Sequence, residues 1–324
     1  MIVDLPDTTV SKIARSLVSV REEGGAVALG RVLTLVIVTT HGLQEEAIEA
    51  ANDASREHPM RVIVLIANTD GEARLDAQIR VGGDAGASEV IVLRAHGAAA
   101  GNQEGLVTGL LLPDAPVVAW WPDYPPAVPA ASDIGRMAQR RITDASTKPY
   151  AKDRLSLLGE SYAPGDTDLA WTRLTHWREQ LAAVLDQPPY EPVTAVEVVG
   201  AGSSPSTGLL AAWLRLKLEV PVMWRYSPAD EWQHGIQLVR LTRPSGDVVL
   251  RRSNDIDATL TQPGQPSHDI VLPRRTLREC LAEELRRLDP DVLYGRVITE
   301  GWALIGPPEQ PGATASESTI SSGS

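Results

Sequence analysis

The sequence predicts an α/β protein made of two α/β domains, with parallel or mixed sheets flanked by helices and added antiparallel hairpins in the second. In the first half, apolar runs rich in β-branched residues alternate with apolar residues at helical spacing, a pattern typical of strands covered by helices. Between residues 235 and 270, short alternating segments separated by turn residues indicate hairpins. A chain of 324 residues with 43% hydrophobic residues can build two cores.

The elements of the first half follow from these two patterns. Residues 8–21 carry apolar side chains at helical spacing and residues 31–38 form a near-continuous apolar run, so a helix precedes a buried strand. The same pair of patterns predicts a helix over 40–57 and a strand over 60–67. Further along the chain, strands are predicted over 75–81 and 88–93, a helix over 101–112, and a strand that ends at Trp121.

The strand ending in Trp120 and Trp121 is the most unusual segment of the chain. Successive side chains of a strand point to opposite faces, so if Trp120 packs into the core, Trp121 must point elsewhere. Pro122 stiffens the loop that follows, and Asp123 and Tyr124 supply its polar groups. The segment is either a capped strand with one surface-packed indole or a protein-binding edge.

Residues 132–143 are predicted to form a helix with Arg136 and Arg140 on one face and Arg141 beside them. Asp144 and Ser146 follow directly. This group would hold an anion or the acidic loop of a partner. The alternative is a solvated, charged helix ended by a polar cap.

The predicted domain boundary lies within residues 148–165, where proline and glycine interrupt both patterns. The predicted domains are 1–160 and 161–305, followed by a disordered tail over 306–324 that has almost nothing to bury.

A long helix is predicted to open at residue 166, capped by Thr167 or Asp166. Trp177 lies on its apolar stripe, and Arg173 and Arg178 lie on its flanks. His176, on the same helix, has no carboxylate or nucleophile beside it and is interpreted as a surface or interface histidine.

A glycine- and hydroxyl-rich turn over 200–208 separates a predicted strand from a helix, an arrangement that can bind phosphate through backbone N–H groups. No lysine follows the last glycine, and Pro205 replaces the third glycine of a dinucleotide fingerprint, so a plain turn is the alternative. The candidate phosphate loop comprises Gly200, Gly202, Ser203, Ser204, Ser206 and Thr207.

The rest of the second half is predicted as a strand over 219–226 containing Trp224 and Arg225, then the hairpins. A capping box formed by Thr276 and Glu279 starts a helix with Cys280 on its apolar stripe, and a last element is predicted over 294–305.

Composition excludes several classes of function. A net charge of -12 disfavours nucleic acid and anionic membranes as ligands, because both require a basic face. The longest apolar run is too short to span a bilayer and the N-terminus has no signal-peptide pattern, so a cytoplasmic protein is expected. A single cysteine excludes an internal disulfide and a multi-thiolate metal site.

No zinc spacing, nucleophile elbow or Walker lysine occurs, so the sequence favours an interaction protein without a cofactor over an enzyme. Tryptophan and arginine, which are enriched at protein interfaces, gather near predicted strand ends and helix starts. The predicted partner-binding residues are Trp120, Trp121, Asp123, Arg140, Arg141, Asp144, Ser146, Arg173, Trp177, Arg178, Trp224 and Arg225.

At these same residues the sequence resembles the OpcA family of glucose-6-phosphate dehydrogenase assembly proteins. The matching segments are LPDAPVVAWWP (112–122), RRITDAS (140–146), TDLAWTRLTHWR (167–178), the loop and helix over 200–217, and PRRTLREC (273–280). Their order and spacing together make the resemblance specific, and it extends over about residues 1–305.

The resemblance implies a non-catalytic partner that favours the active oligomeric form of the dehydrogenase opening the oxidative pentose phosphate pathway, and so supports NADPH production. The rival hypothesis is an enzyme or binding protein that takes a sugar phosphate or nucleotide at the 200–208 turn. Some members of the family are thought to sense thiol redox state through cysteines. Cys280, the single cysteine on an apolar stripe, is instead interpreted as an inert core residue.

Overall fold

The structure, a computed structural model, describes residues 1–23, 30–82, 89–147 and 151–309. The chain forms two compact units. Among the described residues, the first contains those of Met1–Arg173 and Arg275–Thr299, and the second contains those of Leu174–Arg274 and 300–309. The chain therefore leaves the first unit, builds most of the second and then returns. The units change over between Arg173 and Leu174, whereas the sequence places the domain boundary at residue 160.

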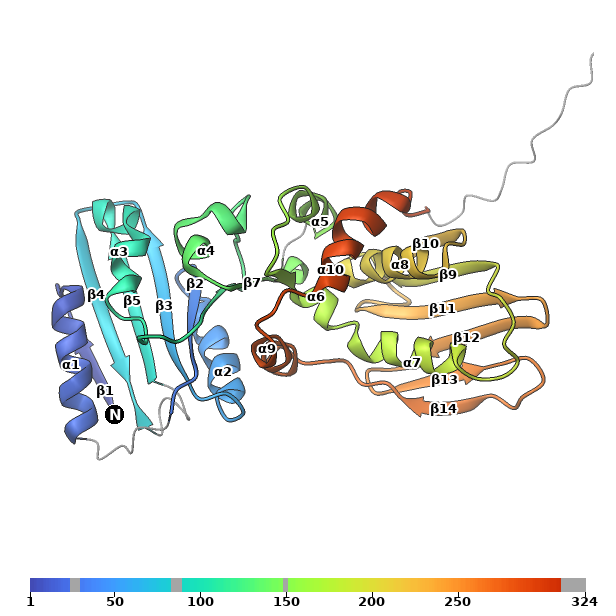
Figure 1. Ribbon diagram of the computed structural model, residues 1–324, viewed down its shortest axis with the longest axis horizontal. Coiled ribbons are helices and arrows are strands. Elements are labelled where there is room, and N and C mark those ends of the chain that lie inside the picture. The colour runs from blue at the N-terminus through green and yellow to red at the C-terminus, as the bar shows by residue number, and fades with distance from the viewer. Residues whose placement is uncertain (24–29, 83–88, 148–150, 310–324) are drawn as a thin grey trace, which may run out of the picture. The chain divides into compact units, whose positions relative to one another are not determined.

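The first unit is built on an eight-stranded sheet in the order β1-β4-β5-β3-β2-β6-β7-β8 (Figure 1). Strands from β5 through β8 in this order run parallel, and β4 and β1 complete one edge in antiparallel pairing. The strands are β1 (Ile2–Leu5), β2 (Leu33–Thr39), β3 (Met60–Asn68), β4 (Arg74–Arg80), β5 (Glu89–His96), β6 (Val117–Trp121), β7 (Arg140–Thr143) and β8 (Asp166–Asp168).

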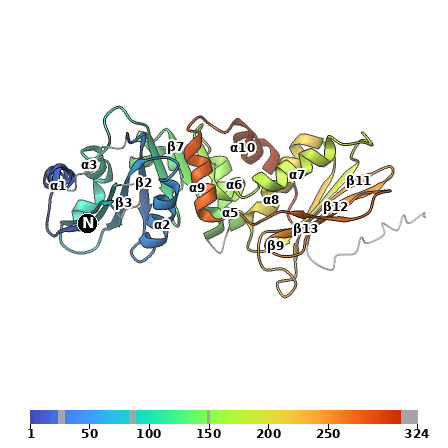
Figure 2. The same ribbon diagram turned by 90° about the horizontal axis from the view of Figure 1, so that it is seen from below.

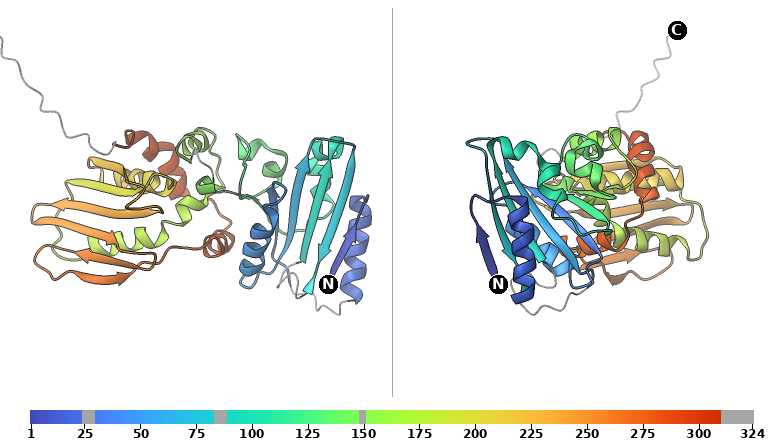
Figure 3. Two further views of the ribbon diagram at one scale, coloured as in Figure 1. Left: turned by 180° about the vertical axis from the view of Figure 1, so that it is seen from behind. Right: turned by 60° about the vertical axis from the view of Figure 1, so that its left-hand side comes forward.

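Helices cover both faces of this sheet, as its nearly uniform apolar strands require. One core contains side chains from α2, α9 and one face of the strands, and the other contains side chains from α1, α3, α4 and the opposite face. Figure 3 shows the ribbon of this sheet and its helices from two further sides. The helices are α1 (Val10–Glu23), α2 (Gln44–Ala54), α3 (Gln103–Thr108), α4 (Asp133–Met137), α5 (Ala151–Glu160), α6 (Leu169–Thr172), α9 (Leu277–Arg286) and α10 (Val292–Arg296). Short helical turns are η2 (Gly97–Gly101), η3 (Pro129–Ala131), η4 (Ala145–Thr147) and η5 (Val297–Gly301).

The second unit contains a six-stranded sheet in the order β10-β9-β11-β12-β13-β14. Only β9 and β10 pair in parallel, joined through α8, and the other neighbours are antiparallel. Helices α7 and α8 lie on one face of this sheet (Figure 2). The elements are α7 (Thr175–Leu185), β9 (Ala195–Ala201), α8 (Pro205–Leu218), β10 (Val222–Ser227), β11 (Ile236–Arg243), β12 (Gly246–Arg252), β13 (Asp257–Thr261), β14 (His268–Val271) and η6 (Trp302–Leu304). The predicted class, two α/β sheets with hairpins in the second, is confirmed.

Two predicted helices are wrong. The helix predicted over 132–143 ends at Met137, and Arg140–Thr143 instead forms β7 between β6 and β8. A helix was predicted to open at residue 166, but Asp166–Asp168 forms strand β8, which pairs with β7. The first helix of this segment, α6, begins at Leu169. Its cap is the Asp168 side chain, which accepts a hydrogen bond from the Ala170 N–H, rather than Thr167 or Asp166.

The end of the described chain is ordered along β10. The carbonyl of Gly306 accepts a hydrogen bond of 2.8 Å from the Trp224 indole, and the N–H of Glu309 donates to the Trp224 carbonyl at 2.9 Å. The predicted disordered tail therefore does not begin at residue 306, and its remainder, 310–324, lies outside the described residues.

Candidate functional site

The carboxyl ends of β2, β6, β7 and β8 meet at one edge of the first sheet. From β2 the chain runs to β3 on one side, and it later returns to β6 on the other side. In open α/β sheets, ligands bind at such a switch point, because the two loops that leave it diverge and open a crevice. The loops after β2 and β6 are therefore the expected place for a site in the first unit.

A pocket of about 200 Å³ lies at this switch point. Its walls come from the loop after β2, the first turns of α2, the loops after β6 and β7, and the start of α9. The pocket, called the Asp123 pocket below, is lined by Leu43, Glu46, Ala47, Pro122, Asp123, Asp144, Thr147 and Leu277. Apolar walls and three carboxylates thus surround one small cavity.

Asp123 joins the two loops at the switch point and is only 4% exposed. Its Oδ2 accepts hydrogen bonds from the Thr40 N–H at 3.2 Å and from the Thr40 hydroxyl at 2.6 Å. Its Oδ1 is buried and accepts no hydrogen bond from any residue that the structure describes. One oxygen of this carboxylate therefore fixes the loop after β2, and the other is left without a partner in the described chain.

Asp144, in contrast, forms an ion pair within the chain. Both of its oxygens accept hydrogen bonds from the Arg173 guanidinium, at 2.8 and 2.7 Å, and Ser146 donates to it from its N–H and its hydroxyl. Burial disfavours the charge on Arg173, but the adjacent Asp144 carboxylate raises the pKa of Arg173 above its ordinary value. Of the predicted partner-binding residues, the structure brings Asp144, Ser146 and Arg173 together in this group, at the wall of the Asp123 pocket.

A second buried carboxylate, Asp168, lies behind this group. It accepts hydrogen bonds from the Thr143 hydroxyl at 2.6 Å and from the Ala145 and Ala170 N–H groups. Complete burial, followed by the nearby charge of Asp144, raises the pKa of Asp168 to about 6. This side chain ties together the ends of β7 and β8 but does not line the pocket.

Arg140 and Arg141 do not form an exposed cationic face, contrary to the prediction. Arg140 pairs with Glu284 and donates to the Asp289 carbonyl at 2.9 Å, while Arg141 pairs with Asp166. Both arginines are buried because β7 is an inner strand rather than a helix. The first ion pair joins β7 to α9, and the second joins β7 to β8.

Trp120 and Trp121 do point to opposite faces of β6, but both are buried, at 0% and 3% exposure. Trp120 packs in the core beneath α2 and α9, and Trp121 in the core beneath α1, α3 and α4. The expected indole at the surface is therefore absent from this strand, since helices cover both faces of the sheet. The exposed aromatic ring of the loop is Tyr124, at 63%.

The remaining predicted partner-binding residues lie in the second unit. Trp177 is buried beneath the Arg252 guanidinium, with 5.2 Å from Arg252 Cζ to the ring centroid. Trp224 is also buried, whereas Arg225 is about one-third exposed and bonds the Glu197 carboxylate at 3.1 Å. Arg178 is half-buried on α7. The structure does not gather these residues into one cavity.

Several polar groups of the candidate phosphate loop over 200–208 already donate hydrogen bonds within the protein. The Ala201 N–H donates to the Gly235 carbonyl at 2.8 Å, the Ser204 N–H to the Ala201 carbonyl at 3.0 Å, and the Ser203 hydroxyl to the Gln233 carbonyl at 3.3 Å. Ser206 and Thr207 are buried, and a Cβ on Gly200 would collide with the Thr207 hydroxyl. Gly202 lies over the Tyr226 ring. These contacts favour a structural turn.

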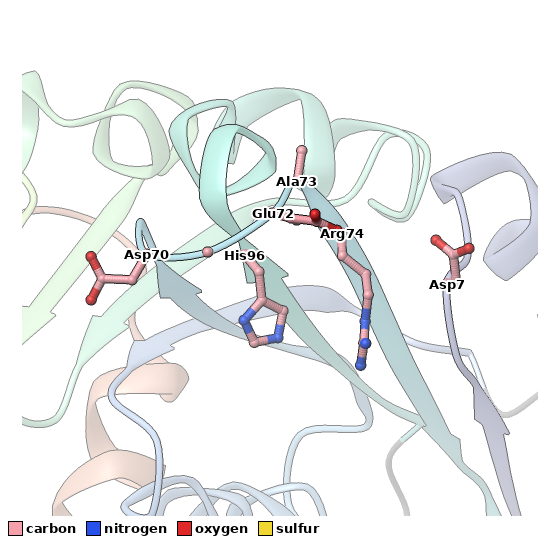
Figure 4. A pocket seen from close by; sticks show the side chains of 7 residues that line it. Asp7, Asp70, Glu72, Ala73, Arg74 and His96 are labelled. Carbon is pink, nitrogen blue, oxygen red and sulfur yellow. The ribbon is translucent and has the colours of Figure 1, made fainter.

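A larger hollow of about 540 Å³ lies near the other edge of the first sheet (Figure 4). Arg74 and His96 extend into it from β4 and β5, and Asp7, Asp70 and Glu72 surround it. Arg74 and His96 are both directed at the carboxylate of Asp76, at 2.5 and 3.8 Å. Since acidic groups outnumber cations here, the hollow suits neither a phosphate nor a nucleotide.

Cys280 is buried in the first core, and burial raises the pKa of its thiol to about 12. It is therefore a thiol rather than a reactive thiolate at neutral pH. Within the described residues, no group of three or more His, Cys, Asp or Glu side chains is placed to hold a metal ion. None of the helices in those ranges combines the length and hydropathy that crossing a bilayer demands.

Six lining residues of the Asp123 pocket were not among the predicted site residues: Leu43, Glu46, Ala47, Pro122, Thr147 and Leu277. Leu43, Glu46 and Pro122 follow strands that the sequence predicts and could have been found from the order of those strands. Thr147 follows β7, which the sequence predicted as part of a helix, so the predicted strands do not mark it. Leu277 comes from α9, more than a hundred residues further along the chain, and no local signal marks it.

Two family models match the chain, one after the other along the sequence. Residues 51–160 match the family model of the glucose-6-phosphate dehydrogenase subunit N-terminal domain, and residues 164–298 match that of the C-terminal domain. No curated protein sequence matches the chain.

Among solved structures, the fold is similar to glucose-6-phosphate 1-dehydrogenase from Mycobacterium avium, at 12% identity over 87% of this chain and 94% of that chain, with a TM-score of 0.44. An oxidoreductase from Sinorhizobium meliloti matches at 12% identity over 84% of this chain and 94% of that chain, with a TM-score of 0.48. The two family models follow one another in order and together match most of the sequence. The chain therefore belongs to the OpcA family of glucose-6-phosphate dehydrogenase subunits.

Proposed function

We propose that this protein is a non-catalytic subunit that binds glucose-6-phosphate dehydrogenase in the cytoplasm and favours its active oligomeric form. The observation that carries the proposal is the match of both halves of the chain, in order, to the two domains of the dehydrogenase subunit family. An activator of this kind must bind the active form of the enzyme better than the inactive form, because only differential affinity shifts an equilibrium.

The chemistry of the switch-point crevice supports a non-catalytic role. A dinucleotide-binding site has a glycine-rich turn after the first strand, and its N–H groups and the helix start receive the pyrophosphate. Here the first turn of α2 carries Glu45 and Glu46, and the Thr40 N–H already donates to the Asp123 carboxylate. A pyrophosphate would meet carboxylates of its own sign, so NADP is disfavoured at this position.

The loops after β2 and β6 also supply the surface of this protein that we propose contacts the dehydrogenase. Leu43 is 49% exposed and Tyr124 is 63% exposed, so an aliphatic and an aromatic side chain stand at the edge of the Asp123 pocket region. Ser146 is exposed and bonds Asp144, a lining residue of the same pocket. The buried members of the predicted set, such as Trp120, Trp121, Arg140 and Arg141, act in this proposal by holding the loops in place rather than by touching the partner.

The test is the rate of NADPH production by the cognate dehydrogenase with and without an equimolar amount of this protein, together with the mass of the mixture by light scattering. We expect a higher rate and a complex that contains both chains. Calorimetry of this protein alone with NADP and with glucose 6-phosphate should show no binding heat. An unchanged rate without a complex would contradict the proposal, and NADP or sugar-phosphate binding by the isolated chain would favour the rival use of the 200–208 turn.

A further inference from the structure

The Asp123 pocket has the composition of a receptor for a side chain that is apolar along its length and cationic at its tip. Leu43, Ala47, Pro122 and Leu277 form apolar walls. Asp123 provides a carboxylate that is 96% buried, since its exposure is 4%. Glu46 adds a second carboxylate, exposed on the first turn of α2. The pocket thus places negative charge both within it and at its rim.

The unpartnered oxygen of Asp123 is the observation that calls for a ligand. A buried carboxylate oxygen without a donor costs free energy, because it has lost water without gaining a hydrogen bond. Asp144, the third carboxylate, is already paired with Arg173. Within the described chain, no lysine or arginine contacts Asp123 or Glu46. The negative charge of Asp123 and Glu46 is therefore not balanced by a cationic side chain of those residues.

We propose that the Asp123 pocket receives a lysine side chain of glucose-6-phosphate dehydrogenase, an inference that rests on the proposed function. The four-carbon stem of lysine packs against the apolar walls while the Asp123 and Glu46 carboxylates attract its ammonium. Arginine fits less well, because its planar fork binds both oxygens of a carboxylate and Thr40 already occupies Oδ2. A calcium ion fits less well too, because it requires six to eight oxygen ligands.

The first test measures the affinity of this protein for the dehydrogenase after single neutralising substitutions. Asp123→Asn keeps a carbonyl oxygen for Thr40 but presents an amide where the ammonium would bind, so we expect a loss of affinity of about tenfold. Glu46→Gln should weaken binding about two- to threefold, an effect that disappears at high salt. Glu49→Gln is the matched control, because Glu49 is exposed on the same helix but does not line the pocket.

The second test uses a carbodiimide, which joins a carboxylate to a lysine amine in direct contact. In the complex with the dehydrogenase, mass spectrometry should identify a cross-link from Glu46 to one lysine of the enzyme, and this product should decline in the Asp123→Asn variant. Thermal unfolding of each variant checks that the fold is retained. Because Glu46 is exposed, its variant remains informative even if Asp123→Asn destabilises the loop.

The outcomes separate the two proposals. Equal affinity for all variants, or an equal loss in all three, overturns the lysine assignment and leaves the proposed function standing. Cross-links from Glu46 only to residues of its own chain overturn it as well, because the donor is then internal. A wild-type protein that forms no complex overturns the proposed function itself.

Discussion

Asp168 is the residue whose ionisation should affect stability most directly. Burial, and then the charge of Asp144, raises its pKa from 3.8 to about 6 in the folded protein. The folded state therefore holds this proton more tightly than the unfolded chain does. The resulting stabilisation is fully present below about pH 4 and is lost as the pH rises through about 6. A shift of this size corresponds to about 3 kcal/mol.

The comparison of wild type with Asp168→Asn isolates this contribution. Urea unfolding from pH 4 to 8 should give a difference in unfolding free energy, wild type minus variant, that falls between about pH 4 and 6.5 and is constant above. Asp133→Asn, a half-buried aspartate in the first turn of α4, is the control for replacing a carboxylate by an amide elsewhere in the first unit. A difference that rises with pH would show that the hydrogen bonds to Asp168 outweigh its burial.

The site residues show what sequence reasoning can and cannot reach at this scale. Asp123 was found because it is a polar residue in the loop that follows a buried strand. Arg140 was interpreted as exposed because its partner, Glu284, is 144 residues away and invisible to local spacing. Asp123 Oδ1 differs from Oδ2 only through the position of Thr40, which comes from another loop. Which charges are paired depends on tertiary structure, so the pocket could not be predicted from the sequence.

At the scale of elements, α9 is the segment whose start the sequence defines best. The predicted capping box is confirmed: the Thr276 hydroxyl accepts from the Glu279 N–H at 3.3 Å, and Glu279 accepts from the Thr276 N–H at 2.7 Å. The helix buries Leu281 and Leu285 in the core with α2 and also brings Leu277 to the Asp123 pocket.

Loss of this cap should therefore affect both stability and partner binding. Thr276→Ala should lower the unfolding free energy by about 1 kcal/mol in urea and weaken binding to the dehydrogenase, because the first turn that carries Leu277 frays. Thr276→Ser keeps the hydroxyl and is the matched control. Full stability in the alanine variant would mean that packing alone defines the start of α9.

Other elements show where sequence patterns succeed and where they fail. Strands β2 and β3 and helix α2 were predicted within a few residues, since each buries a continuous or regularly spaced apolar set. Strands β7 and β8 were missed because they have four and three residues and are polar. β7 pairs with β6 and β8 pairs with β7, and buried ion pairs hold both strands. Neither kind of contact produces a regular spacing of apolar residues in the sequence.

At the scale of the whole molecule, the first unit is discontinuous in sequence. Arg275–Thr299 returns to it after the second unit has been built. Cys280, Leu281 and Leu285 are almost wholly buried in its core. Each large aliphatic side chain removed from a core costs about 2–5 kcal/mol, and a domain has only about 5–15 kcal/mol in all.

A fragment of residues 1–173 should therefore fail to unfold cooperatively, and a peptide of residues 275–299 added in trans should restore the transition. Circular dichroism during heating measures both. The same peptide with Leu281→Asp and Leu285→Asp is the control and should have no effect. A cooperative transition in fragment 1–173 by itself would show that the core is complete without α9.

Because Arg275–Thr299 follows the second unit in sequence, the first unit can be completed only late in translation. A ribosome must translate Leu174–Arg274 before α9 can emerge, a delay on the order of 5–20 s at roughly 5–20 residues per second. During that interval the growing chain has no Leu277, and so it has no complete Asp123 pocket. The lysine contact proposed above therefore requires a chain that has been translated at least as far as α9.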